Sequence, residues 1–196
     1  MRHWAAWLLA AALAGCAVTP PMAPPPAPGD VAQFEDWTAS GRLAVVVDGE
    51  GGSGSFTWQQ RGVSTALSIR GPFGAGGLQV VADDQSMSVT DASGRTVDTD
   101  QAREALRTKL GADLPWAHLR YWMLGVPSPG EPSEVADAGA APVRVIDQSG
   151  WRIVYDTFRS VSGSALPAKF TATRGAVRLK VVIDDWAIVP GAVARP

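Results

Sequence analysis

Apolar side chains occupy every second position in short runs through most of this sequence, for example at Phe56 and Trp58, and at Leu67 and Ile69. Side chains point alternately to the two faces of a strand, so each run predicts a strand with one apolar face. Turn-forming residues separate the runs, which is typical of an antiparallel meander. The predicted strands are 39–47, 53–60, 64–70, 78–81, 143–146, 151–155, 169–173 and 177–183, with Met87, Val89 and Val97 continuing the series around a turn at 91–94.

The period changes in the middle of the chain. Residues 100–110 have apolar positions at helical spacing and are followed by Gly111, which predicts one helix. A second helix is predicted over 115–124, starting at Pro115 and ended by Gly125. Residues 128–142 are polar and rich in Pro, Gly and Ala, which predicts a loop. A sheet interrupted in this way can bury its apolar face by curling around the insert, so we expect mainly antiparallel β with α, as an incomplete barrel with a helical lid.

The first fifteen residues have the pattern of a secretory signal. Arg2 precedes an apolar run over 4–13 that is too short to span a bilayer. The run leads into Leu13-Ala14-Gly15-Cys16, the lipobox pattern, in which Cys16 takes a diacylglyceryl group and becomes the new N-terminus after cleavage. Cys16 is also the only cysteine of the chain, so lipidation accounts for it and leaves no disulfide framework. An ordinary signal peptide with a chance cysteine is the alternative.

Three segments follow from this interpretation. Residues 1–15 are the cleaved signal, and 16–29 are the lipidated cysteine with a proline-rich tether that would reach roughly 35–40 Å in polyproline II geometry. Residues 30–196 are one folded domain of ordinary size. Ala17 follows the cysteine, whereas lipoproteins that bacteria retain in the inner membrane usually have aspartate at that position. Resemblance to lipoproteins sorted in this way implies a lipid anchor in the outer membrane, with the domain facing the periplasm.

Composition argues against an enzyme and against a nucleic-acid-binding protein. Loss of Arg2 with the signal takes the net charge from −2 to −3, which offers no basic face for nucleic acid. His118 is the only histidine left in the mature chain, and we expect it on the surface or as a cap of the second helix. Asp184 and Asp185 are adjacent and should point to opposite sides of a strand, so we interpret them as solvation of a strand end rather than as a catalytic or metal-binding pair. No cofactor or metal is expected.

Several motifs occur together in an order that we recognise. They are Gly41-Arg42-Leu43-Ala44-Val45, Gly54–Gln60, Gly71-Pro72-Phe73-Gly74, Leu119–Pro127, Gly150–Tyr155, Leu166-Pro167 and Arg178–Trp186. With the lipobox, this set resembles the outer-membrane lipoprotein receptors of the LolB family over nearly all of the folded domain. The 128–142 loop is richer in Pro, Gly and Ala than in familiar members, which leaves its conformation open.

The resemblance implies an apolar cavity beneath the helical lid and a transport function. The protein would take acylated lipoproteins from a LolA-like periplasmic carrier, bind their acyl chains and insert them into outer-membrane lipid, working as a monomer. Apolar side chains on one sheet face are suited to such burial. The expected lining is Phe56, Trp58, Leu67, Ile69, Leu78, Val80, Trp151, Ile153, Leu179 and Val181, with Trp122 and Met123 from the lid. The same alternation fits ordinary core, because it does not show whether the space that it faces is filled.

Phe73 is the expected membrane-insertion residue. Pro72 and the glycines of 71–77 favour a tight projecting turn between two strands, with Phe73 near its tip. The resemblance implies that an apolar residue there hands the cargo to lipid, whereas the alternative is a small contact of Phe73 with the barrel rim. A structural or assembly lipoprotein that binds a protein partner remains the second functional hypothesis.

Overall fold

The computed structural model describes residues 34–71, 76–110, 115–137 and 143–189. Within these residues, eleven strands form one antiparallel sheet, and two helices lie between β6 and β7 in the sequence. The strands are β1 Asp36–Val47, β2 Glu50–Arg61, β3 Ser64–Arg70, β4 Gly77–Ala82, β5 Met87–Asp91, β6 Thr96–Asp98, β7 Ser133–Asp137, β8 Arg144–Gln148, β9 Trp151–Val161, β10 Ser164–Arg174 and β11 Val177–Val189. The helices are α1 Thr99–Leu110 and α2 Trp116–Met123.

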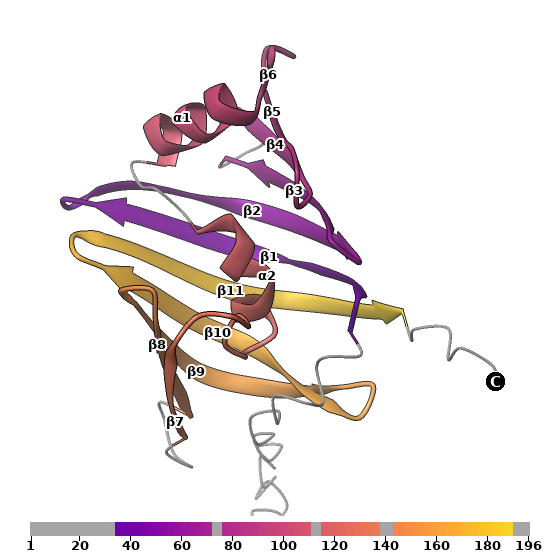
Figure 1. The fold of residues 1–196 in the computed structure, drawn as a ribbon, viewed down its shortest axis with the longest axis vertical. Coiled ribbons are helices and arrows are strands. Elements are labelled where there is room, and N and C mark those ends of the chain that lie inside the picture. The colour runs from indigo at the N-terminus through magenta and orange to yellow at the C-terminus, as the bar shows by residue number, and fades with distance from the viewer. Residues whose placement is uncertain (1–33, 72–75, 111–114, 138–142, 190–196) are drawn as a thin grey trace, which may run out of the picture.

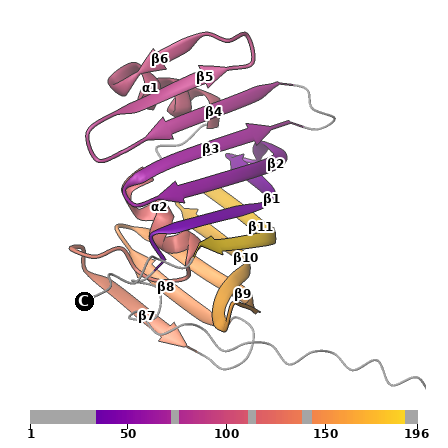
Figure 2. The same ribbon diagram turned by 90° about the vertical axis from the view of Figure 1, so that its right-hand side faces the viewer.

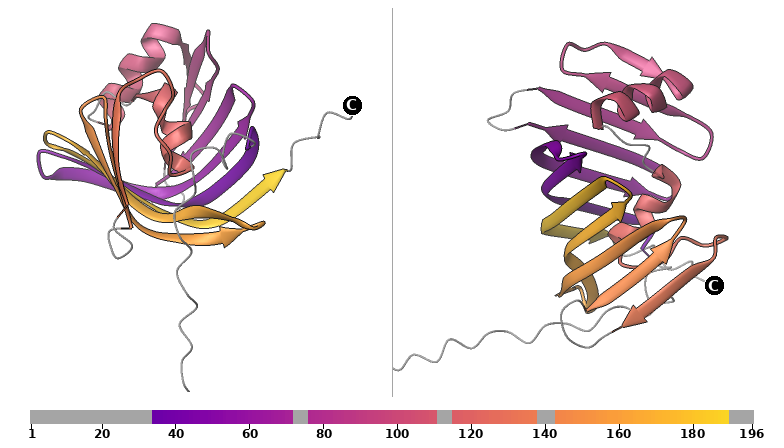
Figure 3. Two further views of the ribbon diagram at one scale, coloured as in Figure 1. Left: turned by 60° about the horizontal axis from the view of Figure 1, so that its bottom comes forward. Right: turned by 90° about the vertical axis from the view of Figure 1, so that its left-hand side faces the viewer.

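The sheet curls without closing. Its strand order is β6-β5-β4-β3-β2-β1-β11-β10-β9-β8-β7, so the first strand pairs with the last in the middle of the sheet, while β6 and β7 form its two edges. Both helices lie on the concave side (Figures 1 and 3). The predicted class, an incomplete antiparallel barrel with helices over its open side, is therefore confirmed.

Antiparallel pairing sorts the connections to two ends of the sheet. At one end β1 begins and β11 finishes, with Asp36 paired to Arg61 and to Val189; we call this the entry end. At the other end Val47 pairs with Glu50 and Val177; we call this the loop end. β3 runs toward the loop end but stops at Arg70, which is level with Ser55 of β2 and Arg42 of β1. Figure 2 shows the two ends on opposite sides of the sheet. The described chain thus starts at the end opposite the β3–β4 connection.

A β-bulge bends the centre of the sheet. The β1–β11 register shifts between Ser40 and Gly41, opposite Asp184. A Cβ atom on Gly41 would collide with the carbonyl oxygen of Val182, so only glycine allows the two strands to approach so closely. Bulges increase the local twist, which a sheet needs to curl into a barrel.

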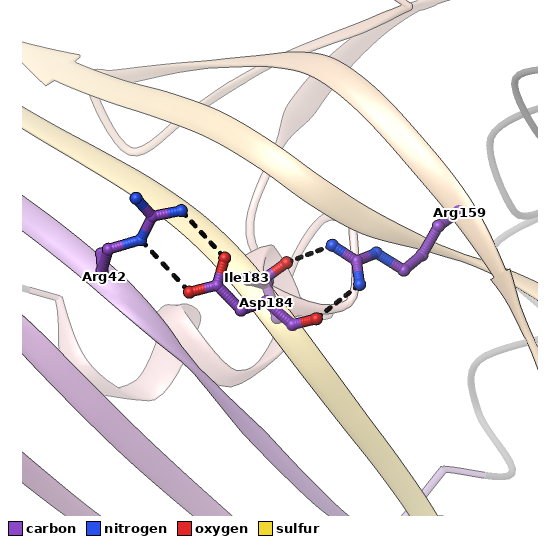
Figure 4. Close-up of polar contacts among 4 residues, drawn as sticks. All are labelled: Arg42, Arg159, Ile183 and Asp184. Carbon is purple, nitrogen blue, oxygen red and sulfur yellow. Dashed lines mark hydrogen bonds and ion pairs between the residues drawn. The ribbon is translucent and has the colours of Figure 1, made fainter. Parts of the chain in front are cut away.

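Two arginines on the convex face bind the bulged strand (Figure 4). Arg42 donates from Nε and Nη2 to the Asp184 carboxylate, and Arg159 donates to the backbone carbonyl groups of Ile183 and Asp184. Asp184 and Asp185 are both exposed and lie inside β11, five and four residues before its end. The expectation that they solvate a strand end from opposite faces was wrong, because the bulge shifts the alternation that it assumed.

Most predicted strands are present, but the structure extends several of them. The main error concerns residues 128–142, predicted as a loop, of which Ser133–Asp137 form the edge strand β7. All five β7 residues are exposed and pair with β8 alone, so no alternation of buried positions marks the strand in the sequence. β10 also begins earlier than predicted, at Ser164, and includes Pro167, which lies next to a register shift. Bulges are among the few positions in a sheet that accept proline.

Both predicted helices are confirmed. Leu119, Trp122 and Met123 form the buried face of α2, and Ala102 and Leu106 are buried on α1. Gly125 follows α2 with φ +81°, and a Cβ atom there would lie 2.8 Å from the Phe158 ring. This position therefore demands glycine both for its backbone conformation and for space.

Candidate functional site

The concave face of the sheet and α2 enclose a small apolar cavity of about 50 Å³. Leu43 and Val45 of β1 and Leu179 and Val181 of β11 contribute to its floor, and all four lie in the loop-end half of their strands. The complete lining is aliphatic and aromatic: Leu43, Val45, Phe56, Trp58, Leu67, Ile69, Trp116, Leu119, Met123, Phe170, Leu179 and Val181. Such a surface offers burial and no hydrogen-bonding groups apart from the indole N–H groups, which suits hydrocarbon chains.

Seven of the twelve residues expected to line a cavity do line this one: Phe56, Trp58, Leu67, Ile69, Met123, Leu179 and Val181. The other five, Leu78, Val80, Trp122, Trp151 and Ile153, are buried elsewhere in the same hydrophobic core. Alternation put all ten of the strand residues on the correct face. It did not distinguish the positions beneath α2 from those that other side chains cover.

Sequence reasoning missed five lining residues: Leu43, Val45, Trp116, Leu119 and Phe170. Leu43 and Val45 carry an alternation signal, since they continue the set of Trp37, Ala39 and Gly41 on the inner face of β1. Trp116 could not be assigned in this way, because it is the first residue of a helix, and strand alternation says nothing about the burial of a helical side chain.

The entry-end half of the concave face is filled by tryptophans. The Trp37 ring stacks on Trp58 with centroids 5.9 Å apart, and its other contact is edge-on to Trp186 at 5.3 Å. The indole N–H of Trp58 donates to the buried Gln60, and that of Trp186 donates to the Pro167 carbonyl. Satisfied indoles of this kind pack as stable core. On β1 and β11 the apolar cavity is thus displaced toward the loop end, whereas on β2 it reaches Trp58.

Buried polar side chains hold the C-terminal end of α2 against β8 and β9. The side-chain Oε1 of Gln148 accepts from the Trp122 indole at 3.0 Å and from the Ser128 backbone N–H at 2.9 Å, while its Nε2 donates to the Ser128 carbonyl at 2.7 Å. The Tyr155 hydroxyl donates to the Trp122 carbonyl at 2.8 Å. Burial raises the pKa of the Tyr155 phenol far above its ordinary value, so the group stays protonated and remains a donor.

A buried arginine extends this set of contacts, which we call the lid clasp (Gln148, Tyr155 and Arg144 with their partners). Arg144 donates to the Gly125 carbonyl at 2.9 Å, directly after α2, and forms a bidentate ion pair with Asp137 of β7. The hydrogen bonds from Arg144, and then its charge, hold the pKa of Asp137 below its ordinary value. Edge strand, sheet and helix end are therefore joined through one guanidinium group.

The structure revises the prediction for His118. It is half-buried on α2 and its ring stacks on Trp122 with centroids 5.7 Å apart, so it is not a surface residue, and the N-cap position is occupied by Pro115. Its Nδ1 is buried without a hydrogen-bond partner. Among the described residues, no three His, Cys, Asp or Glu side chains come together as a metal site, and neither helix is long and apolar enough to cross a membrane.

Two predicted site residues, Cys16 and Phe73, lie outside the described residues. The flanks of the Phe73 segment are described: Arg70 ends β3 and Gly77 begins β4, both on the loop-end side of these two strands and level with Arg42 near the middle of β1. The segment therefore leaves the sheet on the side toward which the apolar cavity is displaced.

Comparison with known proteins identifies the family. The model of the family "Outer membrane lipoprotein LolB" matches residues 35–186, which include every residue that lines the cavity. The chain belongs to the LolB family. Outer-membrane lipoprotein LolB of Halorhodospira halophila is 32% identical over 192 residues, covering 94% of each chain. LolB of Nitrosococcus oceani is 33% identical over 156 residues, covering 79% of this chain and 77% of the relative.

Solved structures with this fold have very different sequences. A LolA superfamily protein from Nitrosomonas europaea superposes with a TM-score of 0.51 at 9% identity, covering 80% of this chain and 87% of that one. A DUF1329 family protein from Desulfovibrio piger superposes with a TM-score of 0.54 at 8% identity, covering 83% and 89%. At such identities the likeness concerns the fold alone. This chain and the LolA superfamily protein thus share the fold of an open barrel at low sequence identity.

Proposed function

We propose that this LolB protein receives lipoproteins from a LolA-like periplasmic carrier, binds their acyl chains in the apolar cavity and inserts them into the outer membrane. Membership of the LolB family over residues 35–186 carries the proposal. The apolar lining supports it, because transfer of acyl chains between two proteins needs burial at each step and no bond has to be made or broken. The shared fold of the carrier superfamily supports an exchange between similar sites.

The anchor and the insertion loop belong to the same proposal. Cys16 carries the acyl chains that hold the protein on the outer membrane, with the domain facing the periplasm. One acyl chain alone gives only marginal binding, whereas the several chains of a lipobox cysteine make a durable anchor. Phe73 enters the lipid interface beside the loop end and disturbs lipid packing where cargo leaves. The domain acts as a monomer in this scheme.

A transfer assay tests the proposal directly. Acylated lipoprotein loaded on the carrier is mixed with this protein in liposomes, and the fraction of cargo in the lipid is measured over time without nucleotide. We expect transfer that depends on this protein and on the acyl groups of the cargo. Equal transfer with protein-free liposomes would refute the function.

A structural or assembly role is the second hypothesis, and the exposed edge strand β7, with Val135 45% exposed, offers it a possible docking edge. Displacement of an environment-sensitive apolar dye by acylated peptides separates the two hypotheses. An acyl-chain site releases the dye, whereas a scaffold that binds through its edge retains or never takes up the dye.

A further inference from the structure

The apolar cavity is too small for the function proposed above, on which this inference rests. Its volume is about 50 Å³, whereas sites for small organic ligands usually measure about 300–1,000 Å³. The side chains around it belong to the hydrophobic core or pack against it, and cores contain few voids, so an acyl chain has to create its own space. Some part of the lining therefore has to move before the site can hold an acyl chain.

A second, larger space adjoins the first helical turn of α2. This interhelix cleft of about 410 Å³ lies between α1, α2 and the β4–β5 turn. The buried side chains of Met87 and Leu106 contribute to its walls, while Asp83, Arg103 and Arg107 line it with charge. Its apolar side chains suit a hydrocarbon chain, and its charged side chains suit a polar group at the end of such a chain.

Trp116 lines both spaces. It is the first residue of α2 and is half-buried, and its large side chain contributes to the wall of the apolar cavity and to that of the cleft. Neighbouring residues of the helix divide between the two, since Leu119 and Met123 line only the cavity whereas Ala117 and His118 line only the cleft. Displacement of one indole group would join the two volumes.

The two ends of α2 are held very differently. The lid clasp fixes the C-terminal end through buried hydrogen bonds from Gln148, Tyr155 and Arg144. At the N-terminal end, Pro115 occupies the N-cap position without any side-chain capping bond. A helix end without a side-chain cap lacks that stabilising hydrogen bond, so the first turn of α2 is the part that moves most easily.

We propose that Trp116 is the gate of the acyl-chain site: an entering chain displaces the indole, joins the apolar cavity to the interhelix cleft and extends into both. The lid clasp keeps the C-terminal end of α2 in place, so the site enlarges at the first turn of the helix. The interhelix cleft is then a subsite for the distal part of a long chain, and short chains need only the apolar cavity.

The test measures affinity against chain length. Saturated fatty acids of about eight to about eighteen carbons compete with a fluorescent apolar dye for the mature protein. Each buried methylene adds about 0.8 kcal/mol, so affinity rises about fourfold per carbon until the site is full. The length at which the rise stops measures the occupied site.

Two variants and one control decide the outcome. Ala117→Trp fills the cleft from an exposed position and should stop the rise at a shorter chain, lowering the affinity for the longest acids at least about tenfold while the shortest bind as before. Trp116→Ala removes the gate and should accelerate uptake of long chains. Glu134→Trp, on the exposed β7, is the matched control and should behave as wild type.

Unchanged length profiles in Ala117→Trp, with unchanged uptake rates in Trp116→Ala, would overturn the gate while leaving the proposed function intact. Failure of the wild type to bind any acid would overturn both. Circular dichroism of each variant verifies that the sheet is folded, so that a lost affinity reports on the cleft.

Discussion

Removal of the Gln148 side chain should loosen α2 and lower the free energy of unfolding by about 3 kcal/mol. The side chain forms three hydrogen bonds of 3.0 Å or less, with the Trp122 indole, the Ser128 N–H and the Ser128 carbonyl. A buried hydrogen bond between neutral groups contributes about 1 kcal/mol, and a buried group left without a partner costs about 1–3 kcal/mol. Gln148→Ala removes the three bonds together, so about 3 kcal/mol is the lower part of the expected range.

Urea unfolding of the variant and wild type, monitored by tryptophan fluorescence, gives this difference from the two transition midpoints at constant slope. Gln79→Ala is the matched control, because Gln79 is an exposed residue of β4, and its substitution should change stability by less than about 0.5 kcal/mol. Hydrogen exchange should also become faster at the backbone amides of α2 in Gln148→Ala. Equal stabilities of the two variants, with unchanged exchange in α2, would refute the role of the clasp.

The anchor, the insertion loop, the direction of transfer and the acid stability of the edge strand can each be tested as well. Cys16→Ala, expressed without its signal, should stay in the soluble fraction, and pelleting with outer membranes after a salt wash would contradict the anchor. Phe73→Glu should accept cargo but deliver it poorly to liposomes, because a carboxylate resists burial in lipid; normal delivery rules out the insertion role. This protein should bind the lipoprotein cargo more tightly than the carrier does, and each tenfold difference in affinity corresponds to about 1.4 kcal/mol of binding free energy. Titration of both proteins side by side checks this. Arg144 lowers the pKa of Asp137 in the folded protein, so the ionised carboxylate stabilises the fold above about pH 4 and this contribution is lost as pH falls through the lowered pKa. Asp137→Asn should therefore lose less stability than wild type on acidification. Urea titration at several pH values measures this difference.

Local patterns predicted the sheet because most strands have one solvent-exposed face and one buried face. Alternation therefore recorded burial directly at positions such as Phe56 and Leu179. β7 was not predicted for the same reason: both of its faces are exposed, and its pairing with β8 produces no alternation of apolar residues. The bulge at Asp184 was not predicted either, because it depends on a close approach to Gly41, which is 143 residues away in the sequence.

The site was predicted in kind but only partly in detail. A concave apolar face follows from strand patterns, yet the cavity occupies only the part of that face that α2 covers. Where the helix lies is decided by its contacts with Gln148 and Tyr155, whose side chains satisfy backbone and indole groups of α2 and of the residues just after it. The tertiary fold brings these hydrogen-bond partners together, and no residue spacing in the sequence predicts them.

The distance from the start of β1 to the end of β3 sets a minimum length for the segment between Cys16 and β1. β3 ends at Arg70, which lies level with Ser55 of β2 and with Arg42 of β1, six residues after Asp36, so about 20 Å at 3.3 Å per residue separates the start of β1 from the level at which β3 ends. Seventeen residues, 17 to 33, separate Cys16 from Phe34, and at about 3.1 Å each they reach about 53 Å. If both the anchor and the loop touch the same bilayer, the chain has to run back along about half of β1, which leaves a margin of about ten residues. A deletion of more than that from the proline-rich segment would leave the protein attached yet hold its delivery end off the membrane.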